Sequence, residues 1–154
     1  MTFPDEKFTD MGAFAGAYFQ ASQVAQASVD RVALAKAGAL LAGAYAARKT
    51  IYVCGNGGSA AISNHLVCDH LKCIQTDTAL LPRVVSLSAT IETITAVAND
   101  ISYDEIFVYQ LRTLADPGDV LISISSSGDS ENVVRACDWA KANDLAVIAM
   151  TGFA

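Results

Sequence analysis

Two loops rich in glycine and hydroxyl side chains carry the clearest chemistry in this sequence. The first, GNGGS at residues 55–59, directly follows the apolar run 51–54, and the second, SSSGDS at residues 125–130, follows the apolar run 120–124. Glycine lets the backbone approach a ligand closely, and the free N–H groups where a helix begins attract negative charge. Two such loops favour a phosphorylated small molecule over a dinucleotide as the ligand.

The usual nucleotide-binding motifs fit the first loop poorly. The chain has no GxxxxGK[ST] sequence, and the loop lacks the GxGxxG spacing because Ala60 stands three residues after Gly57. No acidic residue ends the next predicted strand, where a ribose would bind, so NAD and ATP are disfavoured. A lone glycine turn could be merely structural, but a second loop at the matching topological position favours a ligand site.

A second group of reactive side chains follows the first loop. His65 and Asp69 are four residues apart and so share one face of a helix, with Cys68 and Lys72 beside them. Such a pair can donate two ligands to a divalent metal, or supply a general base and the group that orients it. The alternative to these functional roles is that the two side chains are solvated or form hydrogen bonds within the protein core. His70 points about 140° away from His65, which argues against a four-ligand Cys/His zinc site on this helix.

Alternating apolar strands and helices must position these groups. Residues 5–49 are predicted to be helical, with Ser28 as the N-cap of the second of two helices. The later elements are predicted as strands at 51–54, 83–87, 120–124 and 145–150, and as helices at 59–74, 90–97, 103–114 and 130–143, with Asn99-Asp100 separating two of these helices. This pattern predicts an α/β fold, a three-layer αβα sandwich with a parallel sheet, preceded by two N-terminal helices. Both loops then meet at the carboxyl edge of the sheet, where such proteins bind ligands.

Composition and charge restrict the classes of partner. The 154 residues, 53% of them hydrophobic, are predicted to form a single domain, 1–154, with a helical pair at 1–49 and an α/β core at 50–154. A net charge of −6 without a cluster of lysine and arginine disfavours nucleic acid and membranes as partners. The sequence shows no signal peptide and no apolar run of about 18 residues, so we expect a cytoplasmic protein with four reduced cysteines.

Several segments together resemble the sugar isomerase (SIS) domain superfamily, and within it the phosphoheptose isomerases. The resemblance rests on CGNGGSAA at 54–61, His65 with an acid four residues later, Asn99-Asp100, and ISSSGDSENV at 124–133. It implies a Rossmann-like SIS fold and the conversion of sedoheptulose 7-phosphate to glycero-manno-heptose 7-phosphate through an enediol with metal assistance. It also implies a homotetramer with sites at subunit interfaces and the N-terminal helices in the interface.

The resemblance implies roles for the matching residues. His65 and Asp69 are the expected zinc ligands and catalytic residues, and Asp69 would also move the proton. The expected substrate-binding residues are Asn56, Gly57, Gly58, Ser59, Asn99, Asp100, Ser125, Ser126, Ser127 and Ser130. Phosphoheptose isomerases commonly carry glutamate where this chain has Asp69, which shortens the reach by about 1 Å, a displacement that can cost about 100-fold in rate. The glutamine and histidine that complete the family's site would lie beyond residue 154, so we expect the C-terminal part of the domain to be missing from this sequence.

Two other functions remain open from the sequence. A non-catalytic SIS protein could bind a phosphosugar or a protein partner in a regulatory role, and it would need the serine loop but no metal ligands. The His65 and Asp69 pair favours the enzyme. A transcriptional regulator would need a DNA-binding region, and residues 1–50 show no basic recognition helix.

Overall fold

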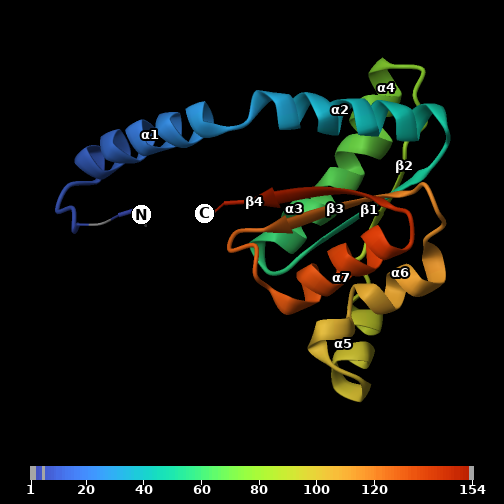
Figure 1. The fold of residues 1–154 in the computed structure, drawn as a ribbon. Coiled ribbons are helices and arrows are strands. Elements are labelled where there is room, and N and C mark those ends of the chain that lie inside the picture. Colours follow the sequence, from blue (N-terminus) through green and yellow to red (C-terminus); the bar gives the residue numbers. More distant parts are fainter. Residues whose placement is uncertain (1–2, 5, 153–154) are drawn as a thin grey trace. The chain divides into compact units, whose positions relative to one another are not determined.

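The computed structural model describes residues 3–4 and 6–152 (Figure 1). The chain divides into two compact units, Met1–Gly38 and Ala39–Ala154. In the first unit the aromatic rings near α1 (Met11–Ser28) form a cluster with centroids 5.5–6.3 Å apart. The members of this cluster are Phe3, Phe8, Phe14 and Tyr18.

The predicted helical stretch 5–49 is two helices, α1 and α2 (Arg31–Ala46), and the first begins later than expected. Ser28 is not the N-cap of α2, because it is the last residue of α1 and its hydroxyl donates to a carbonyl of that helix. Asp30 caps α2 instead, since its carboxylate accepts hydrogen bonds from two N–H groups of the first turn. Aspartate and serine are equally good N-caps, so residue type alone did not distinguish the two positions.

Four strands form a parallel sheet in the order β2-β1-β3-β4. They are β1 (Thr50–Gly55), β2 (Arg83–Ser86), β3 (Val120–Ser125) and β4 (Ala146–Thr151), each within one residue of its predicted bounds. The chain leaves β1 toward β2 and leaves β3 toward β4, in opposite directions along the sheet. The switch point between β1 and β3 is where open α/β sheets bind ligands.

The remaining helices lie between successive strands in the chain. They are α3 (Gly58–Cys68), the π-helical turn η1 (Asp69–Ile74), α4 (Gln75–Asp77), α5 (Ile91–Asp100), the 3₁₀ turn η2 (Tyr103–Glu105), α6 (Val108–Leu114) and α7 (Glu131–Ala142). Asn99 and Asp100, predicted to separate two helices, are instead the last residues of α5. The helix continues through them because the backbone leaves the helical conformation only at Ile101, whose N–H still bonds to the carbonyl of Val97.

Helices cover both faces of the sheet, which confirms the three-layer α/β prediction. Alternate side chains of β1 enter opposite cores: Ile51 and Val53 on one face, Tyr52 and Cys54 on the other. The first face packs against α3 and the C-terminal part of α2, and the second against α5, α6 and α7 (Figure 1). Within the described residues no helix is both long and apolar enough to cross a membrane.

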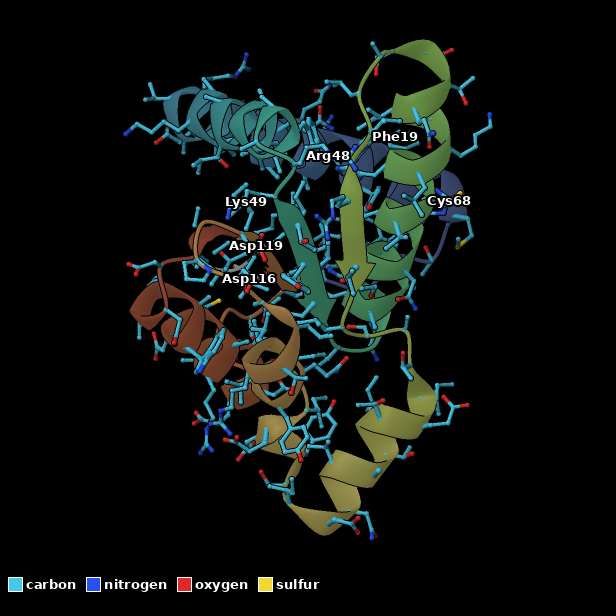
Figure 2. All side chains as sticks on the ribbon, turned by 90° about the vertical axis from the view of Figure 1, so that its right-hand side faces the viewer. Phe19, Arg48, Lys49, Cys68, Asp116 and Asp119 are labelled. Carbon is cyan, nitrogen blue, oxygen red and sulfur yellow. The ribbon has the colours of Figure 1, made fainter. Side chains whose placement is uncertain are left out.

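The amino ends of β1 and β3 are tied together by Asp119. Its buried carboxylate accepts hydrogen bonds from the N–H groups of Thr50 at 2.8 Å and Asp116 at 3.0 Å. Lys49 donates to the carbonyl of Pro117 at 2.7 Å, and Figure 2 shows Lys49 close to Asp116 and Asp119 at this edge. These contacts hold the edge opposite the glycine and serine loops, which leaves the carboxyl edge for a ligand.

Candidate functional site

The first loop connects β1 to α3 in a tight turn that packs against β3. A Cβ on Gly55 would stand 2.7 Å from the Cβ of Ser59 and 2.8 Å from the carbonyl oxygen of Ile124, so only glycine fits. Gly57 has φ 54° and ψ −121°, a conformation that other residues rarely adopt. These two requirements explain the glycine spacing of the loop and bring its backbone against β3.

Asn56 links the first loop to the segments that follow β2 and β3. Its Nδ2 donates to Oδ1 of Asn132 at 2.9 Å, and Nδ2 of Asn132 donates back to Oδ1 of Asn56 at 3.0 Å. The hydroxyl of Tyr103 also donates to Oδ1 of Asn56, at 3.0 Å. Neither Asn132 nor Tyr103 was among the predicted site residues. Asn132 is 1% exposed, and the sequence feature that could have indicated its role is an amide on the otherwise apolar face of α7.

The second loop closes a cavity against the first, here called the serine hollow. It measures about 230 Å³ and is lined by Asn56, Ser59, Ile124, Ser125, Ser126, Ser127 and Ser130. The hydroxyl of Ser125 accepts a hydrogen bond from the N–H of Gly128 at 3.0 Å, which shapes the loop. Ser130 is the N-cap of α7, and within the described chain its hydroxyl makes no capping hydrogen bond. Hydroxyls and the amino end of a twelve-residue helix therefore meet at one hollow, which suits an anion such as phosphate.

Glu131 is an acidic residue in the first turn of α7, where it would repel an anion. Its carboxylate is paired with the Nε of Arg135 at 2.7 Å, and Arg135 also contacts Glu105 at 3.0 Å. The hydrogen bonds that Arg135 donates to Glu131 and Glu105 raise the pKa of its guanidinium above the ordinary value. The ion pair offsets the negative charge of Glu131 beside the serine hollow.

A second, smaller hollow of about 180 Å³ also borders Asn56 and includes Gly57, Ser88 and Tyr103 in its lining. Ser88 donates from its hydroxyl to the carbonyl of Gly55 at 2.8 Å and accepts from the N–H of the same residue at 3.2 Å. This contact joins the segment after β2 to the end of β1. Ser88 was not among the predicted site residues, although the loop 88–90 after β2 was expected at this edge of the sheet.

His65 and Asp69 line neither hollow and lie on the surface of the helix that follows the first loop. The Nε2 of His65 is 3.4 Å from Oδ1 of Asp69, and the two side chains are 73% and 52% exposed. Two donors of a tetrahedral zinc ion, each about 2.0–2.2 Å from the metal, stand about 3.4 Å apart. The pair therefore fits two positions of a zinc site. The part of the chain that the structure describes contains no cluster of three or more potential metal ligands, so the pair does not complete such a site here.

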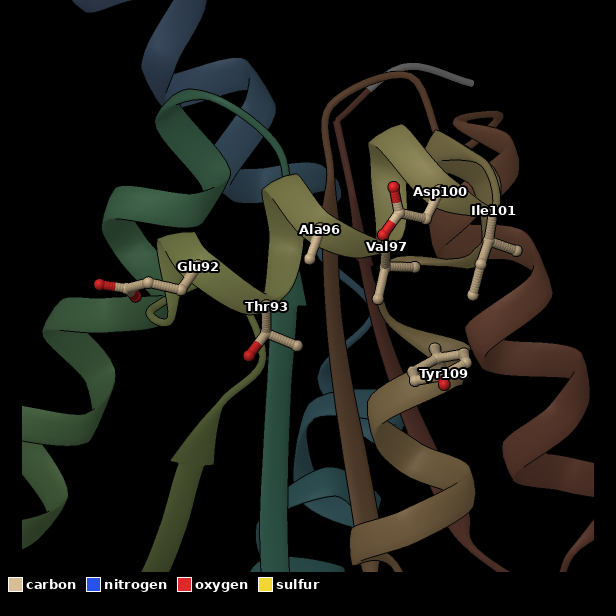
Figure 3. A pocket seen from close by; sticks show the side chains of 7 residues that line it. All are labelled: Glu92, Thr93, Ala96, Val97, Asp100, Ile101 and Tyr109. Carbon is tan, nitrogen blue, oxygen red and sulfur yellow. The ribbon is translucent and has the colours of Figure 1, made fainter.

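Asn99 and Asp100 lie at a third location, apart from the two hollows and from the His65–Asp69 pair. The Nδ2 of Asn99 donates to Oδ1 of Asp100 at 2.8 Å, and Asp100 lines a groove of about 430 Å³ (Figure 3). The rest of this lining is Glu92, Thr93, Ala96, Val97, Ile101 and Tyr109, on or next to α5 and α6. The structure thus joins the two predicted loops at one hollow and leaves the other two predicted pairs apart from it.

Comparison with known proteins identifies close relatives. The SIS domain model matches residues 17–152. The phosphoheptose isomerase of Colwellia psychrerythraea is 41% identical over 133 residues, which cover 86% of this chain and 65% of that protein. The phosphoheptose isomerase of Alteromonas mediterranea is 39% identical over 132 residues, with 86% and 64% covered. The chain spans slightly less than two thirds of the length of these two curated relatives.

Two solved structures share the fold. A phosphoheptose isomerase from Neisseria gonorrhoeae has a TM-score of 0.80 and 33% identity, covering 91% of this chain and 72% of that one. A phosphoheptose isomerase from Francisella tularensis has a TM-score of 0.84 and 30% identity, covering 95% and 79%. Since the family model covers far more than half of the residues, and sequence and structure agree with it, the chain belongs to the SIS domain family.

Proposed function

We propose that this chain contributes the phosphate-binding loops and part of the catalytic site of a phosphosugar isomerase, which converts sedoheptulose 7-phosphate to glycero-manno-heptose 7-phosphate. The observation that carries the proposal is the serine hollow, where five serines and the amino end of α7 meet Asn56. The identity of 41% to a phosphoheptose isomerase supports the substrate.

Phosphate binding in the serine hollow relies on hydroxyls and the helix end, in a chain whose net charge is −6. Each hydrogen bond to a charged group contributes about 1.5–3 kcal/mol, and the helix terminus adds about 0.3–1 kcal/mol. This binding energy arises far from the reacting carbons and serves to align them. Asn56, Gly57, Gly58 and Ser59 are assigned to the sugar beside the phosphate.

Isomerisation moves a proton between neighbouring carbons through an enediol. We assign the proton transfer to the Asp69 carboxylate, which His65 orients, and the sugar hydroxyls to Asn99 and Asp100. A zinc ion held by His65 and Asp69 with further ligands would polarise the substrate oxygens as a Lewis acid. The exposure of this pair fits a homotetramer with sites at subunit interfaces, and we propose that the enzyme is cytoplasmic.

The test is an assay of the protein on sedoheptulose 7-phosphate, with and without a chelator, beside Asp69→Asn. We expect both treatments to lower turnover by about 100-fold or more, because each removes a group aligned with the reacting atoms. Asp77→Asn, an exposed aspartate on the same helical segment, is the control and should keep full activity. Turnover that neither treatment changes would contradict the roles of zinc and Asp69.

The separation of His65 and Asp69 from the serine hollow favours one alternative, a non-catalytic SIS protein that binds a phosphosugar in a regulatory role. Titration calorimetry with sedoheptulose 7-phosphate distinguishes the two functions. Binding without turnover would support the regulatory protein. A serine hollow that binds neither the phosphosugar nor inorganic phosphate would contradict both.

A further inference from the structure

The helix that follows the first loop widens at Asp69. α3 ends at Cys68, and the next six residues form the π-helical turn η1 before α4 begins. Single π-helical turns inside α-helices are rare and frequently occur at functional sites. The sequence of this turn, DHLKCI, contains neither glycine nor proline, so backbone freedom does not explain the widening.

His70 holds the junction between the two helix types. Its Nδ1 lies 2.8 Å from the carbonyl oxygen of Leu66, which also accepts a hydrogen bond from the N–H of Asp69. Because a carbonyl oxygen only accepts, Nδ1 carries the hydrogen and donates it. The side chain therefore points back to the preceding helical turn and donates a hydrogen bond to its backbone where the π-helical turn begins.

The His70 ring is also fixed by its surroundings. It is 7% exposed and contacts the ring of Tyr45 edge-on, with centroids 5.9 Å apart. Tyr45 and Leu66 both pack against the core on this face of the sheet. The other ring nitrogen, Nε2, is buried without a hydrogen-bond partner among the described residues. Buried polar atoms are nearly always paired, so an apolar side chain would suit this packing better, and the bond from Nδ1 is what histidine adds.

We propose that His70 is a positioning residue for the Asp69 carboxylate, an inference that rests on the proposed function. Asp69 directly precedes His70 in the chain and opens the π-helical turn, with its Oδ1 3.4 Å from Nε2 of His65. Aspartate has one methylene fewer than glutamate, so it has less freedom to adjust its reach by side-chain rotation. The position of its backbone therefore decides where the carboxylate lies, and the bond from His70 to Leu66 sets that position.

The test is a double-mutant cycle between positions 69 and 70, read as zinc affinity by titration calorimetry. We expect His70→Leu to weaken zinc binding about tenfold, as the loss of groups that orient metal ligands does. His70→Asn keeps an N–H donor near the place of Nδ1 and should restore most of the affinity. In the background of Asp69→Glu, His70→Leu should lower the zinc affinity less than about threefold, because the longer side chain adapts. A general loss of stability would instead lower the zinc affinity equally in both backgrounds.

Two controls isolate the effect. His65→Ala gives the zinc binding that comes from other groups, such as the exposed Cys68, and this background is subtracted. Ser63→Ala is the matched control, because Ser63 is fully buried on the same helix and its hydroxyl donates to the carbonyl of Ser59 at 2.8 Å. It should leave the zinc affinity unchanged. In zinc-free protein, amide hydrogen exchange across residues 69–74 should quicken in His70→Leu and not in His70→Asn.

The outcomes separate this inference from the proposed function. Suppose that zinc binding depends on His65, but His70→Leu leaves the zinc affinity unchanged or lowers it equally in the wild-type and Asp69→Glu backgrounds. Either result would overturn the positioning role alone. His70→Asn binding as weakly as His70→Leu, or unchanged exchange across the π-helical turn, would do the same. A wild-type chain without zinc binding that depends on His65 would overturn the zinc assignment of the proposed function and this inference with it.

Discussion

Asn56 and Asn132, 76 positions apart in the sequence, donate hydrogen bonds to each other across the switch point of the sheet. Asn56 belongs to the loop after β1, and Asn132 lies in the first turn of α7, directly after the serine loop. The pair therefore sets the distance between the two loops that line the serine hollow. A partly buried polar pair whose members hydrogen-bond to each other stiffens the surrounding structure, so the hollow is shaped before a ligand binds.

Asn132→Ala is expected to lower the free energy of unfolding by about 2 kcal/mol, because it leaves the side chain of Asn56 without its buried partner. The same change should weaken phosphate binding, since the two loops lose their fixed spacing. Urea unfolding followed by circular dichroism measures the first effect, and titration with inorganic phosphate the second. Gln75→Ala removes an exposed amide from α4 whose side chain makes no hydrogen bond within the described chain, and it should stay within about 0.5 kcal/mol of wild type. Wild-type stability in Asn132→Ala would refute the role of the pair.

Gly55→Ala is expected to destabilise the fold by about 1–3 kcal/mol, because overpacking forces the backbone to move. The added methyl would stand 2.8 Å from the carbonyl oxygen of Ile124, which belongs to β3 and cannot move away without disturbing the sheet. Thermal unfolding measures the effect. Gly43→Ala, in an exposed part of α2 where no described residue lies within 4 Å of the added methyl, should instead stabilise by about 1 kcal/mol. A Gly55→Ala variant that is as stable as wild type, or more stable like Gly43→Ala, would contradict the crowding at Gly55.

The strands and both loops could be predicted from the sequence because local pattern and tertiary structure agree there. β1 and β3 are buried on both faces, since helices cover both, and each leads into a turn rich in glycine or serine. Parallel strands bring their carboxyl ends to one edge, so the meeting of the two loops followed from topology. The serine hollow was predictable for this reason.

The contacts that hold the site together could not be predicted in the same way. The partners of Asn56 depend on how α7 and η2 pack, and no short-range pattern encodes a bond between Asn56 and Tyr103. The π-helical turn at Asp69 coincides with the burial of His70 against Tyr45, a contact that a helical periodicity does not show. Tertiary contacts of single side chains decide these features.

Ser130→Ala is expected to weaken the binding of inorganic phosphate about tenfold, the loss of one hydrogen bond to a charged group. The stability of α7 should change little, because the hydroxyl of Ser130 makes no capping hydrogen bond within the described chain. Titration calorimetry and thermal unfolding separate the two effects. Thr113→Ala removes an exposed hydroxyl from α6, away from the lining of the serine hollow, and should change neither. A variant that loses stability but keeps its phosphate affinity would show that Ser130 is a helix cap and not a ligand contact.

Cys54 should make the protein less stable at alkaline pH. Burial raises the pKa of its thiol far above the ordinary value of 9.0, with a smaller contribution from Cys137. As the pH rises above about 9, the unfolded chain therefore loses a proton that the folded chain keeps, and stability falls by up to about 1.4 kcal/mol per pH unit. Below that pH the group contributes its full stabilisation. Cys54→Ala should flatten this slope between about pH 9 and 10 in urea unfolding, even if the cavity it leaves lowers stability at every pH. Cys68→Ala, at an exposed position, should keep the wild-type slope, and parallel curves for wild type and Cys54→Ala would show that the buried thiol does not cause the loss.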